Sequence, residues 1–237
     1  MQIEVLPDAE AACARGAALI AAEARAAVAA RGRFLLAVSG GKNPWKMFRT
    51  LADEEVPWDK LEIVQVDERV APDGDPDRNL THLRESLLGH APLRPEQIHA
   101  MPVTDSDLQA AAGRYARTLE QLAGPLPVID LVHLGIGPDG HTASLVPGDP
   151  VLEITDVDVA LTGVYQGRRR MTLTYPVLNR ARSIVWLITD EPKADALARL
   201  SKGDPTIPAG RVRGDRAHVL ADRAAAVRLD IPAGPSK

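Results

Sequence analysis

Short apolar runs alternate with longer stretches of helical spacing along this chain, and that alternation limits its fold more than any other feature. The clearest apolar runs of strand length are residues 34–38, 61–66, 128–134 and 183–189. Helical spacing is found at residues 8–31, 43–54, 77–88, 108–122 and 192–200. Alternating strands and helices predict an α/β fold with an open, mainly parallel, Rossmann-like sheet and helices on both faces. Ligands bind such a sheet in the crevice beyond the carboxyl ends of its strands.

Weaker patterns complete the expected secondary structure. Further strands are expected at residues 157–164, 171–174 and 218–220, and a further helix after Asp222. The helix at 43–54 is expected to begin with Asn43 as its N-cap and Pro44 in its first turn, where a missing N–H costs nothing.

The length of the chain suits one large domain. With 237 residues and 45% apolar content, it can bury a sizeable core, so residues 1–237 are expected to form a single domain. The aromatic share of only 3% indicates a core of aliphatic side chains. The tail after Ile231 contains proline and glycine, and we expect it to be frayed.

Charge and cysteine content exclude several classes of protein. A net charge of -4 and a pI near 5.9 argue against nucleic acid or an anionic membrane as a partner. Cys13 is the only cysteine, which excludes an internal disulfide and a thiolate metal cluster within one chain. A reducing compartment, the cytoplasm, fits best. Charged residues interrupt the alanine-rich segment 8–31, so it reads as an amphipathic helix rather than a membrane span.

The segment from Ser39 to Pro44 joins the first clear strand to a helix. Its residues Gly40, Gly41, Lys42 and Asn43 offer backbone N–H groups and a helix N-terminus, which suit a bound phosphate. A tight turn that needs glycine for positive φ explains the same residues equally well. The segment lacks the spacing of a P-loop.

A second glycine-rich loop follows the strand at 128–134. Gly135–Gly140 matches the Gly-x-Gly-x-x-Gly dinucleotide pattern, but Pro138 and the later Pro147 leave no room for the long helix that this fingerprint should open. Asp139 and His141 are better explained as side chains that the loop presents at the sheet edge. A histidine there can take a proton near neutral pH, which makes His141 the candidate base.

Charged residues at other strand ends are further candidates. Asp67, Glu68 and Arg69 follow the second clear strand, where the acidic pair would orient Arg69 toward an anionic substrate or a developing oxyanion. Lys193 and one arginine at most of the run 168–170 are the remaining basic candidates. The other histidines are expected to be solvated or structural, and His133 to be structural within its strand.

Several of these segments together carry a resemblance. They are Ser39-Gly40-Gly41 with Pro44, Asp67-Glu68-Arg69, Asn79-Leu80, GIGPDGHTASLVP at 135–147, RMTLT at 170–174 with Leu178-Asn179, and Lys193. On these motifs the chain resembles the 6-phosphogluconolactonase family, which shares its fold with glucosamine-6-phosphate deaminases and isomerases. The resemblance covers nearly the whole chain, and its most specific motif is GIGPDGHTASL.

The resemblance implies hydrolysis of 6-phospho-D-glucono-1,5-lactone to 6-phosphogluconate in the oxidative pentose phosphate pathway, with neither metal nor organic cofactor. His141 would activate the attacking water, and Asp139 would orient the imidazole. Arg69 and the Gly40-Gly41 backbone would hold the phosphate or stabilise the oxyanion, helped by a basic pair further along the chain, Arg170 and Lys193. The expected partner is a small-molecule sugar phosphate, and the chain is expected to act as a monomer or weak homodimer.

The chain departs from the family pattern at two places. Lys42-Asn43 stands where the family usually has a small hydroxyl residue, and Val146-Pro147 where it more often has Phe-Pro. Neither change removes a candidate catalytic group, so the departures concern the loops rather than the reaction.

Three rival interpretations are weighed against a lactonase. A glucosamine-6-phosphate deaminase or isomerase would carry an extra carboxylate just after the histidine, and Thr142-Ala143-Ser144-Leu145 supplies none. A serine esterase would use Ser39 with Asp190 and His218, but Ser39 ends the first clear strand, with no earlier strands to supply the oxyanion loop. A non-catalytic sugar-phosphate sensor would be expected to have lost His141 or Asp139.

Overall fold

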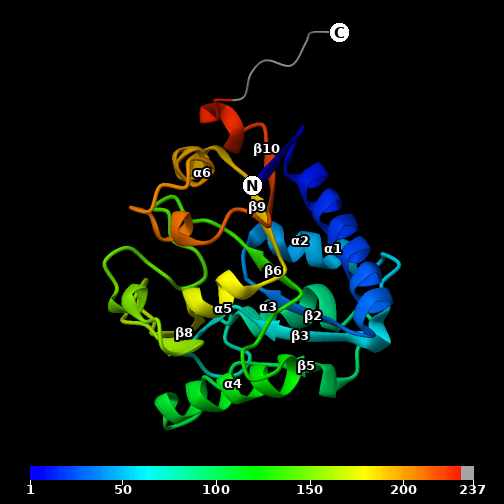
Figure 1. Ribbon diagram of the computed structural model, residues 1–237, viewed down its shortest axis with the longest axis vertical. Coiled ribbons are helices and arrows are strands. Elements are labelled where there is room, and N and C mark those ends of the chain that lie inside the picture. The colour runs from blue at the N-terminus through cyan, green and yellow to red at the C-terminus, as the bar shows by residue number, and fades with distance from the viewer. Residues whose placement is uncertain (231–237) are drawn as a thin grey trace.

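The computed structural model describes residues 1–230, so the tail after Ile231 lies outside the described residues. Two sheets form its framework (Figure 1). The larger sheet has the order β1-β10-β9-β6-β2-β3-β5, and all its neighbouring strands are parallel. Its strands are β1 (Gln2–Leu6), β2 (Phe34–Val38), β3 (Leu61–Gln65), β5 (Ile98–His99), β6 (Leu131–Leu134), β9 (Ser183–Ile188) and β10 (Ala217–Asp222). The smaller sheet is antiparallel, in the order β4-β8-β7, and consists of β4 (Asp67–Arg69), β7 (Val159–Leu161) and β8 (Arg170–Leu173).

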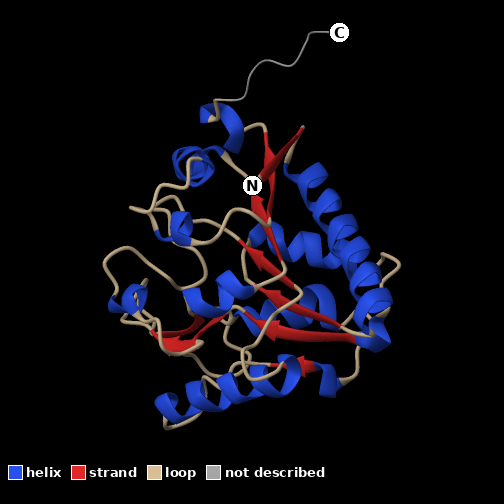
Figure 2. Ribbon diagram, viewed as in Figure 1, coloured by secondary structure: helices blue, strands red, loops and turns tan. Residues whose placement is uncertain are grey.

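Helices cover both faces of the larger sheet (Figure 2). One face packs against α1 (Ala9–Arg31), α2 (Lys42–Leu51) and α3 (Asn79–Leu83), and α3 continues into a π-helical turn at Arg84–Leu88. The other face packs against α4 (Leu108–Ala123), α5 (Tyr175–Arg180) and α6 (Ala194–Ser201). The predicted α/β fold, with a mainly parallel sheet between helices, is confirmed.

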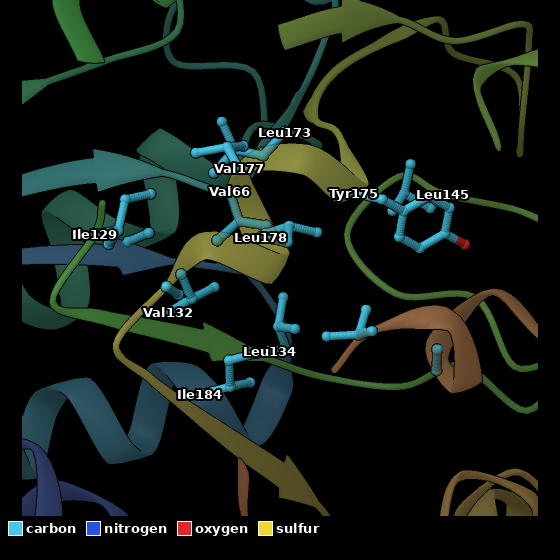
Figure 3. Close-up of a cluster of buried hydrophobic side chains, with 14 of the residues drawn as sticks. Val66, Ile129, Val132, Leu134, Leu145, Leu173, Tyr175, Val177, Leu178 and Ile184 are labelled. Carbon is cyan, nitrogen blue, oxygen red and sulfur yellow. The ribbon is translucent and has the colours of Figure 1, made fainter. Parts of the chain in front are cut away.

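Side-chain alternation along the central strands separates two hydrophobic cores. In β2, Leu35 and Ala37 belong to the core under α4, α5 and α6, while Leu36 and Val38 belong to the core under α1 and α2. This is the period of two that a strand buried on both faces must have. Figure 3 shows part of the first core, where side chains of α5 lie beside those of β6.

The long first helix has a clear start and a clear end. Asp8 accepts a hydrogen bond from the Ala11 N–H as N-cap, and Gly32 ends α1 with a φ of 74°. Its buried stripe is mostly alanine, including Ala17, Ala21 and Ala24, so the helix axis can lie close to the sheet.

The sheet order places a topological switch between β2 and β6. From β2 the chain crosses to β3 on one side, while from β6 it proceeds to β9 on the other side. The loops that follow β2 and β6 therefore leave in opposite directions and open a crevice between them, where ligands bind in folds of this kind. Both glycine-rich segments lie at this switch.

Several predicted elements need correction. Asn43 is not the N-cap of α2, because Gly41 occupies that position and the Asn43 side chain donates instead to Thr189. Residues 67–69, expected to follow the strand at 61–66, form a strand of their own, β4, since they pair with β8. The strand expected at 157–164 is only Val159–Leu161, and the helix expected after Asp222 is a single 3₁₀ turn at Ala225–Arg228. The short elements β1, β5 and α5 were not predicted.

Candidate active site

A polar cavity lies at the carboxyl edge of the larger sheet, where the loops after β2, β3, β6 and β9 meet. The residues predicted from the sequence that line it are Ser39, Gly40, Gly41, Lys42, Asn43, Asp67, Arg69, His141, Arg170 and Lys193. Asp139 contacts His141 from outside the cavity wall, and Glu68 is fully buried beneath it. The structure thus brings together most of the predicted residues from five distant segments of the chain.

His141 and Asp139 form a hydrogen-bonded pair in the loop after β6. Nδ1 of His141 lies 2.6 Å from Oδ1 of Asp139, which also accepts the His141 backbone N–H at 3.1 Å. Burial would raise the pKa of Asp139, but the bonds from His141 and the imidazole charge outweigh it and lower the pKa. The carboxylate therefore stays ionised, and Nε2 of the imidazole is left to act on a ligand.

Glycine at position 137 is required by this arrangement. A Cβ atom on Gly137 would lie 2.1 Å from Nδ1 of His141, so any side chain would displace the imidazole. Gly137 therefore makes room for the histidine ring, while Gly140 makes room for Ile207, against which its Cβ atom would lie at 2.6 Å.

Tyr165, which the sequence did not single out, is a third member of the group around His141. Its hydroxyl donates to Oδ2 of Asp139 at 3.1 Å, and its ring meets the His141 ring edge-on with centroids 5.4 Å apart. Tyr165 belongs to the loop between β7 and β8, and no nearby motif marks it.

Two arginines from the smaller sheet face the cavity. Arg69 ends β4 and Arg170 begins β8, and the two are paired in the β-ladder. The Nε atoms of both are buried and lack a hydrogen-bond partner within residues 1–230. Burial and the neighbouring Arg69 charge lower the pKa of Arg170. Two adjacent cations with unsatisfied donors favour an anionic ligand.

Of the arginine run, only Arg170 lines the main cavity. Arg168 lies in a neighbouring depression and pairs with Asp75 and Asp77, and Arg169 is exposed. The structure therefore places one of the three arginines against the cavity, and its part in substrate binding stays a prediction.

The far side of the cavity is formed by the loop after β9. Lys193 has a lowered pKa because burial disfavours its charge more than the nearby Asp190 and Asp222 favour it. Asp190 has a φ of 79°, a region that few residues other than glycine adopt, and its carboxylate accepts a bond from Nδ2 of Asn43. Asn43 therefore connects the loop after β2 to the loop after β9.

The loop after β2 leads directly into α2. Gly41 is its N-cap, with a φ of 144°, and no side chain caps the first turn. A Cβ atom on Gly40 would lie 2.1 Å from Oδ1 of Asn79, so this glycine is needed for close packing. The uncapped N–H groups at the start of α2 face the cavity edge and suit an anion.

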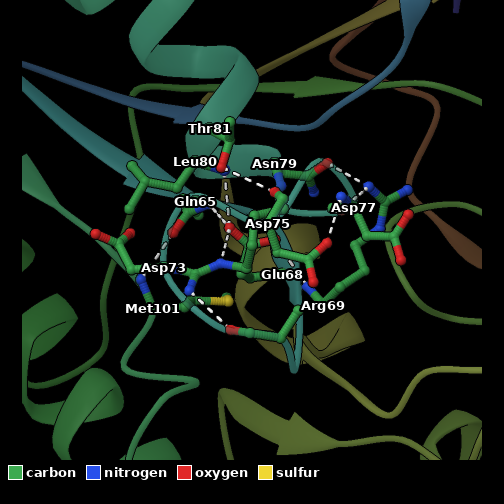
Figure 4. Close-up of polar contacts among 12 residues, drawn as sticks. Gln65, Glu68, Arg69, Asp73, Asp75, Asp77, Asn79, Leu80, Thr81 and Met101 are labelled. Atoms are coloured by element: carbon green, nitrogen blue, oxygen red, sulfur yellow. Dashed lines mark hydrogen bonds and ion pairs between the residues drawn. The ribbon is translucent and has the colours of Figure 1, made fainter.

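Glu68 supports the site from below. Its carboxylate accepts the backbone N–H groups of Asn79 and Leu80, each at 2.8 Å, and lies 3.1 Å from Nε of Arg78 (Figure 4). Both oxygens are occupied by these partners, and the side chain does not line the cavity. Glu68 is therefore a buried support that connects β4, which carries Arg69, to the start of α3.

Asp67 is held from both sides. Ser144 donates to its Oδ2 at 2.6 Å, and Nδ2 of Asn79 donates to its backbone oxygen at 3.0 Å. Ser144, in the segment after His141, thus fixes the position of Asp67. Within the described residues, the segment 142–145 places no further carboxylate beside the imidazole.

The residues of the proposed serine triad are not assembled. His218 stands near the amino end of β10 and lines a different depression, whereas Ser39 and Asp190 line the cavity at the opposite edge. Oγ of Ser39 lies instead 3.3 Å from Nδ1 of His133, which is fully buried. Burial lowers the pKa of His133 to about 3, so this histidine is a poor base for the serine. The serine esterase alternative is therefore wrong.

Residues 1–230 hold no group of three or more His, Cys, Asp or Glu side chains placed to bind a metal ion. No helix among them is both long and apolar enough to span a membrane.

Comparison with known proteins gives one consistent result for the sequence. Residues 7–221 match the family of glucosamine-6-phosphate isomerases and 6-phosphogluconolactonase. A 6-phosphogluconolactonase of Mycobacterium tuberculosis is 38% identical over 242 residues, covering 96% of this chain and 98% of its own. One from Nostoc sp. is 35% identical over 202 residues, covering 84% of each chain.

Solved structures share the fold. The 6-phosphogluconolactonase of Trypanosoma brucei superposes with a TM-score of 0.86 at 25% identity, covering 96% of this chain and 98% of that one. A monomeric glucosamine-6-phosphate deaminase superposes with a TM-score of 0.84 at 19% identity, covering 96% and 100%. Since both activities occur on this fold, the fold alone does not choose between them.

Proposed function

Because the chain belongs to the family of glucosamine-6-phosphate isomerases and 6-phosphogluconolactonases, we propose that its cavity hydrolyses 6-phospho-D-glucono-1,5-lactone with His141 as the general base. The activity it carries is lactone hydrolysis of the 6-phosphogluconolactonase type, which its bacterial relatives share. The product is 6-phosphogluconate, the acid formed in the oxidative pentose phosphate pathway.

One observation carries the mechanistic proposal. The imidazole of His141, backed by Asp139, opens onto the same cavity as Arg69 and Arg170, whose buried Nε donors lack partners in the described structure. A base beside unsatisfied cationic donors suits a substrate that is both anionic and attacked by water.

The reaction follows from these positions. With Nδ1–H of His141 donating to Asp139, Nε2 takes a proton from water as the water oxygen attacks the lactone carbonyl. A cationic donor of the cavity stabilises the tetrahedral oxyanion that forms. The bond between the carbonyl carbon and the ring oxygen then breaks, and the imidazolium returns its proton to that ring oxygen. The product carboxylic acid ionises and releases one proton.

The phosphate of the substrate needs its own donors. Lys193, the start of α2 and the arginine pair all line the cavity and supply positive charge or free N–H groups. We propose that these groups divide between the phosphate and the oxyanion.

The segment 142–145 favours a lactonase over a deaminase. Thr142 bonds to the backbone oxygen of Gly135, Ser144 bonds to Asp67, and Leu145 is buried. A deaminase needs a second carboxylate near the histidine for its proton transfers, and this segment offers none.

The test is proton release from freshly prepared 6-phosphogluconolactone, corrected for spontaneous hydrolysis. His141→Ala should lower kcat by about two to four orders of magnitude with little change in KM, because general base catalysis contributes about that much. His90→Ala is the matched control, since His90 is exposed and its ring nitrogen bonds to the Glu85 backbone oxygen, outside the cavity. A wild-type protein that does not accelerate hydrolysis would refute the proposal and make glucosamine 6-phosphate the next substrate to test.

A further inference from the structure

The loop between β7 and β8 forms a small hairpin beside the cavity. The backbones of Tyr165 and Arg168 bond to each other in both directions, at 2.9 and 3.2 Å. The two residues between them, Gln166 and Gly167, have φ values of 51° and 78°. Two successive positive φ values are typical of a tight type I′ hairpin turn. The turn fixes where the side chains of Tyr165 and Arg168 emerge.

Each end of this hairpin is tied to another part of the site. Arg168 bonds to Asp77 at 2.9 Å and to Asp75 at 3.2 Å. The backbone oxygen of Asp77 in turn accepts a bond from Arg69 at 2.8 Å. Gln166 accepts a bond from Nη2 of Arg170 at 3.2 Å. The hairpin is therefore held in place by the loop that positions one cavity arginine and by the other arginine itself.

Tyr165 lies between the base and the cations. Its hydroxyl donates a hydrogen bond to Oδ2 of Asp139, whereas His141 bonds to Oδ1. Its ring meets the imidazole edge-on, and the guanidinium of Arg170 lies 5.0 Å from the ring centroid. A cation over an aromatic face is attracted by the ring quadrupole.

We propose that Tyr165 is a positioning residue with two separable roles. Its hydroxyl fixes the Asp139 carboxylate, and through it the His141 imidazole, while its ring supports Arg170 for substrate binding. The inference rests on the proposed function, because it concerns the same cavity.

The Tyr165 hydroxyl is needed to hold the Asp139 carboxylate because that side chain is exposed. The Asp139 side chain is 39% accessible to solvent, so a carboxylate anchored by one oxygen alone is free to rotate. With His141 on one oxygen and Tyr165 on the other, the plane of the carboxylate is set. This in turn sets the direction in which Nε2 of the imidazole points.

Two substitutions separate the roles. Tyr165→Phe removes only the hydroxyl, so we expect kcat to fall about tenfold while KM stays within about twofold. Tyr165→Leu removes the ring as well, so KM should also rise, because Arg170 loses the face it lies against. Thermal unfolding of each variant checks that it is folded.

Tyr175 provides a matched control. Its hydroxyl donates to the Pro208 backbone oxygen at 3.0 Å, and Arg211 lies 4.7 Å from its ring centroid, but neither contact touches the cavity. Tyr175→Phe loses the same kind of bond from a tyrosine beside an arginine, and both kcat and KM should stay unchanged.

A second measurement does not depend on turnover. The bond from Tyr165 favours the ionised form of Asp139, so carbon NMR titration should show a higher pKa for this carboxyl in Tyr165→Phe than in the wild type. His141 on the same loop and Tyr165 on the hairpin are the titratable groups that contact Asp139, and Arg170 lies on the ring face. Tyr175→Phe should leave this pKa unchanged.

The outcomes are distinguishable. If the wild type hydrolyses the lactone and Tyr165→Phe keeps the wild-type kcat, or loses rate only through KM, the inference about Tyr165 is overturned and the proposed function stands. If the wild type does not hydrolyse the lactone, the proposed function falls. The Asp139 titration then decides alone: an unchanged pKa overturns the positioning role, and a raised one supports it.

Discussion

Oε2 of Glu68 lies 3.1 Å from Nε of Arg78, and the two side chains are 0% and 3% exposed. The pair supports strand β4, which carries Arg69, so we expect Glu68→Gln to destabilise the protein strongly. Loss of one partner leaves a buried, unpaired charge, which costs about 3–5 kcal/mol of the free energy of unfolding. Urea denaturation measures this.

Asp53→Asn is the control for that loss. Asp53 pairs with Arg49 at a similar distance of 2.9 Å, but its side chain is 71% exposed. Its removal should cost no more than about 1 kcal/mol. Equal losses of the free energy of unfolding in the two variants would mean that the buried pair does not stabilise the fold more than an exposed one.

Lys193 should make ligand binding weaken at alkaline pH. Burial lowers the pKa of Lys193, so its charge is lost at a lower pH than that of an ordinary lysine. Calorimetric binding of 6-phosphogluconate should therefore weaken as the pH rises through this lowered pKa. In Lys193→Arg this weakening of 6-phosphogluconate binding should move to higher pH, because arginine stays protonated. A binding profile identical in both proteins would remove Lys193 from the phosphate site.

His133 should make the fold sensitive to acid. Burial lowers its pKa from 6.5 to about 3 in the folded protein. Between these values the unfolded chain binds a proton that the folded chain does not, so stability falls as the pH decreases. The slope from this residue alone is at most about 1.4 kcal/mol per pH unit.

Substitution of that histidine isolates its share of the acid sensitivity. In His133→Gln the free energy of unfolding, measured by urea denaturation from pH 7 to pH 4, should fall less steeply than in the wild type. Parallel curves for the two proteins would show that His133 titrates normally in the folded state.

Asp190 should reveal backbone strain at the cavity edge. Asp190→Ala and Asp190→Gly both remove the carboxylate that Asn43 contacts, so they differ only in the Cβ atom that strains a backbone of positive φ. With φ at 79° and ψ at 138°, we expect the glycine variant to be more stable than the alanine variant by about 1 kcal/mol. Glu191 is the first residue of the following 3₁₀ turn, and there the alanine variant should be more stable than the glycine variant.

Much of the site could be predicted because strand ends are visible in the sequence. Apolar runs that stop at Ser39, Asp67 and Gly135 place the residues after them at one edge of a parallel sheet, and the structure brings them together there. The fold class follows from the same alternation of strands and helices, and it is confirmed by the observed sheet.

What the sequence did not predict depends on contacts between distant segments. Tyr165 reaches Asp139 across 26 positions of the chain, and no local pattern marks such a contact. Asn43 has the residue type of an N-cap, but its amide is used by Thr189, 146 positions away. Glu68 sits in the same charged triplet as Arg69, and the alternation of strand β4 turns the two side chains to opposite sides.

The distribution of the site along the chain has a consequence for folding kinetics. The cavity draws on the loops after β2 and β6, on both arginine strands of the smaller sheet, and on Lys193 just before α6. No fragment that ends before β9 contains it, and the parallel neighbours β2 and β6 can pair only after a long loop has closed. During refolding from urea, lactone hydrolysis should therefore return later than the helical circular dichroism signal, and a nascent chain gains its chemistry only after β9 and Lys193 have been synthesised.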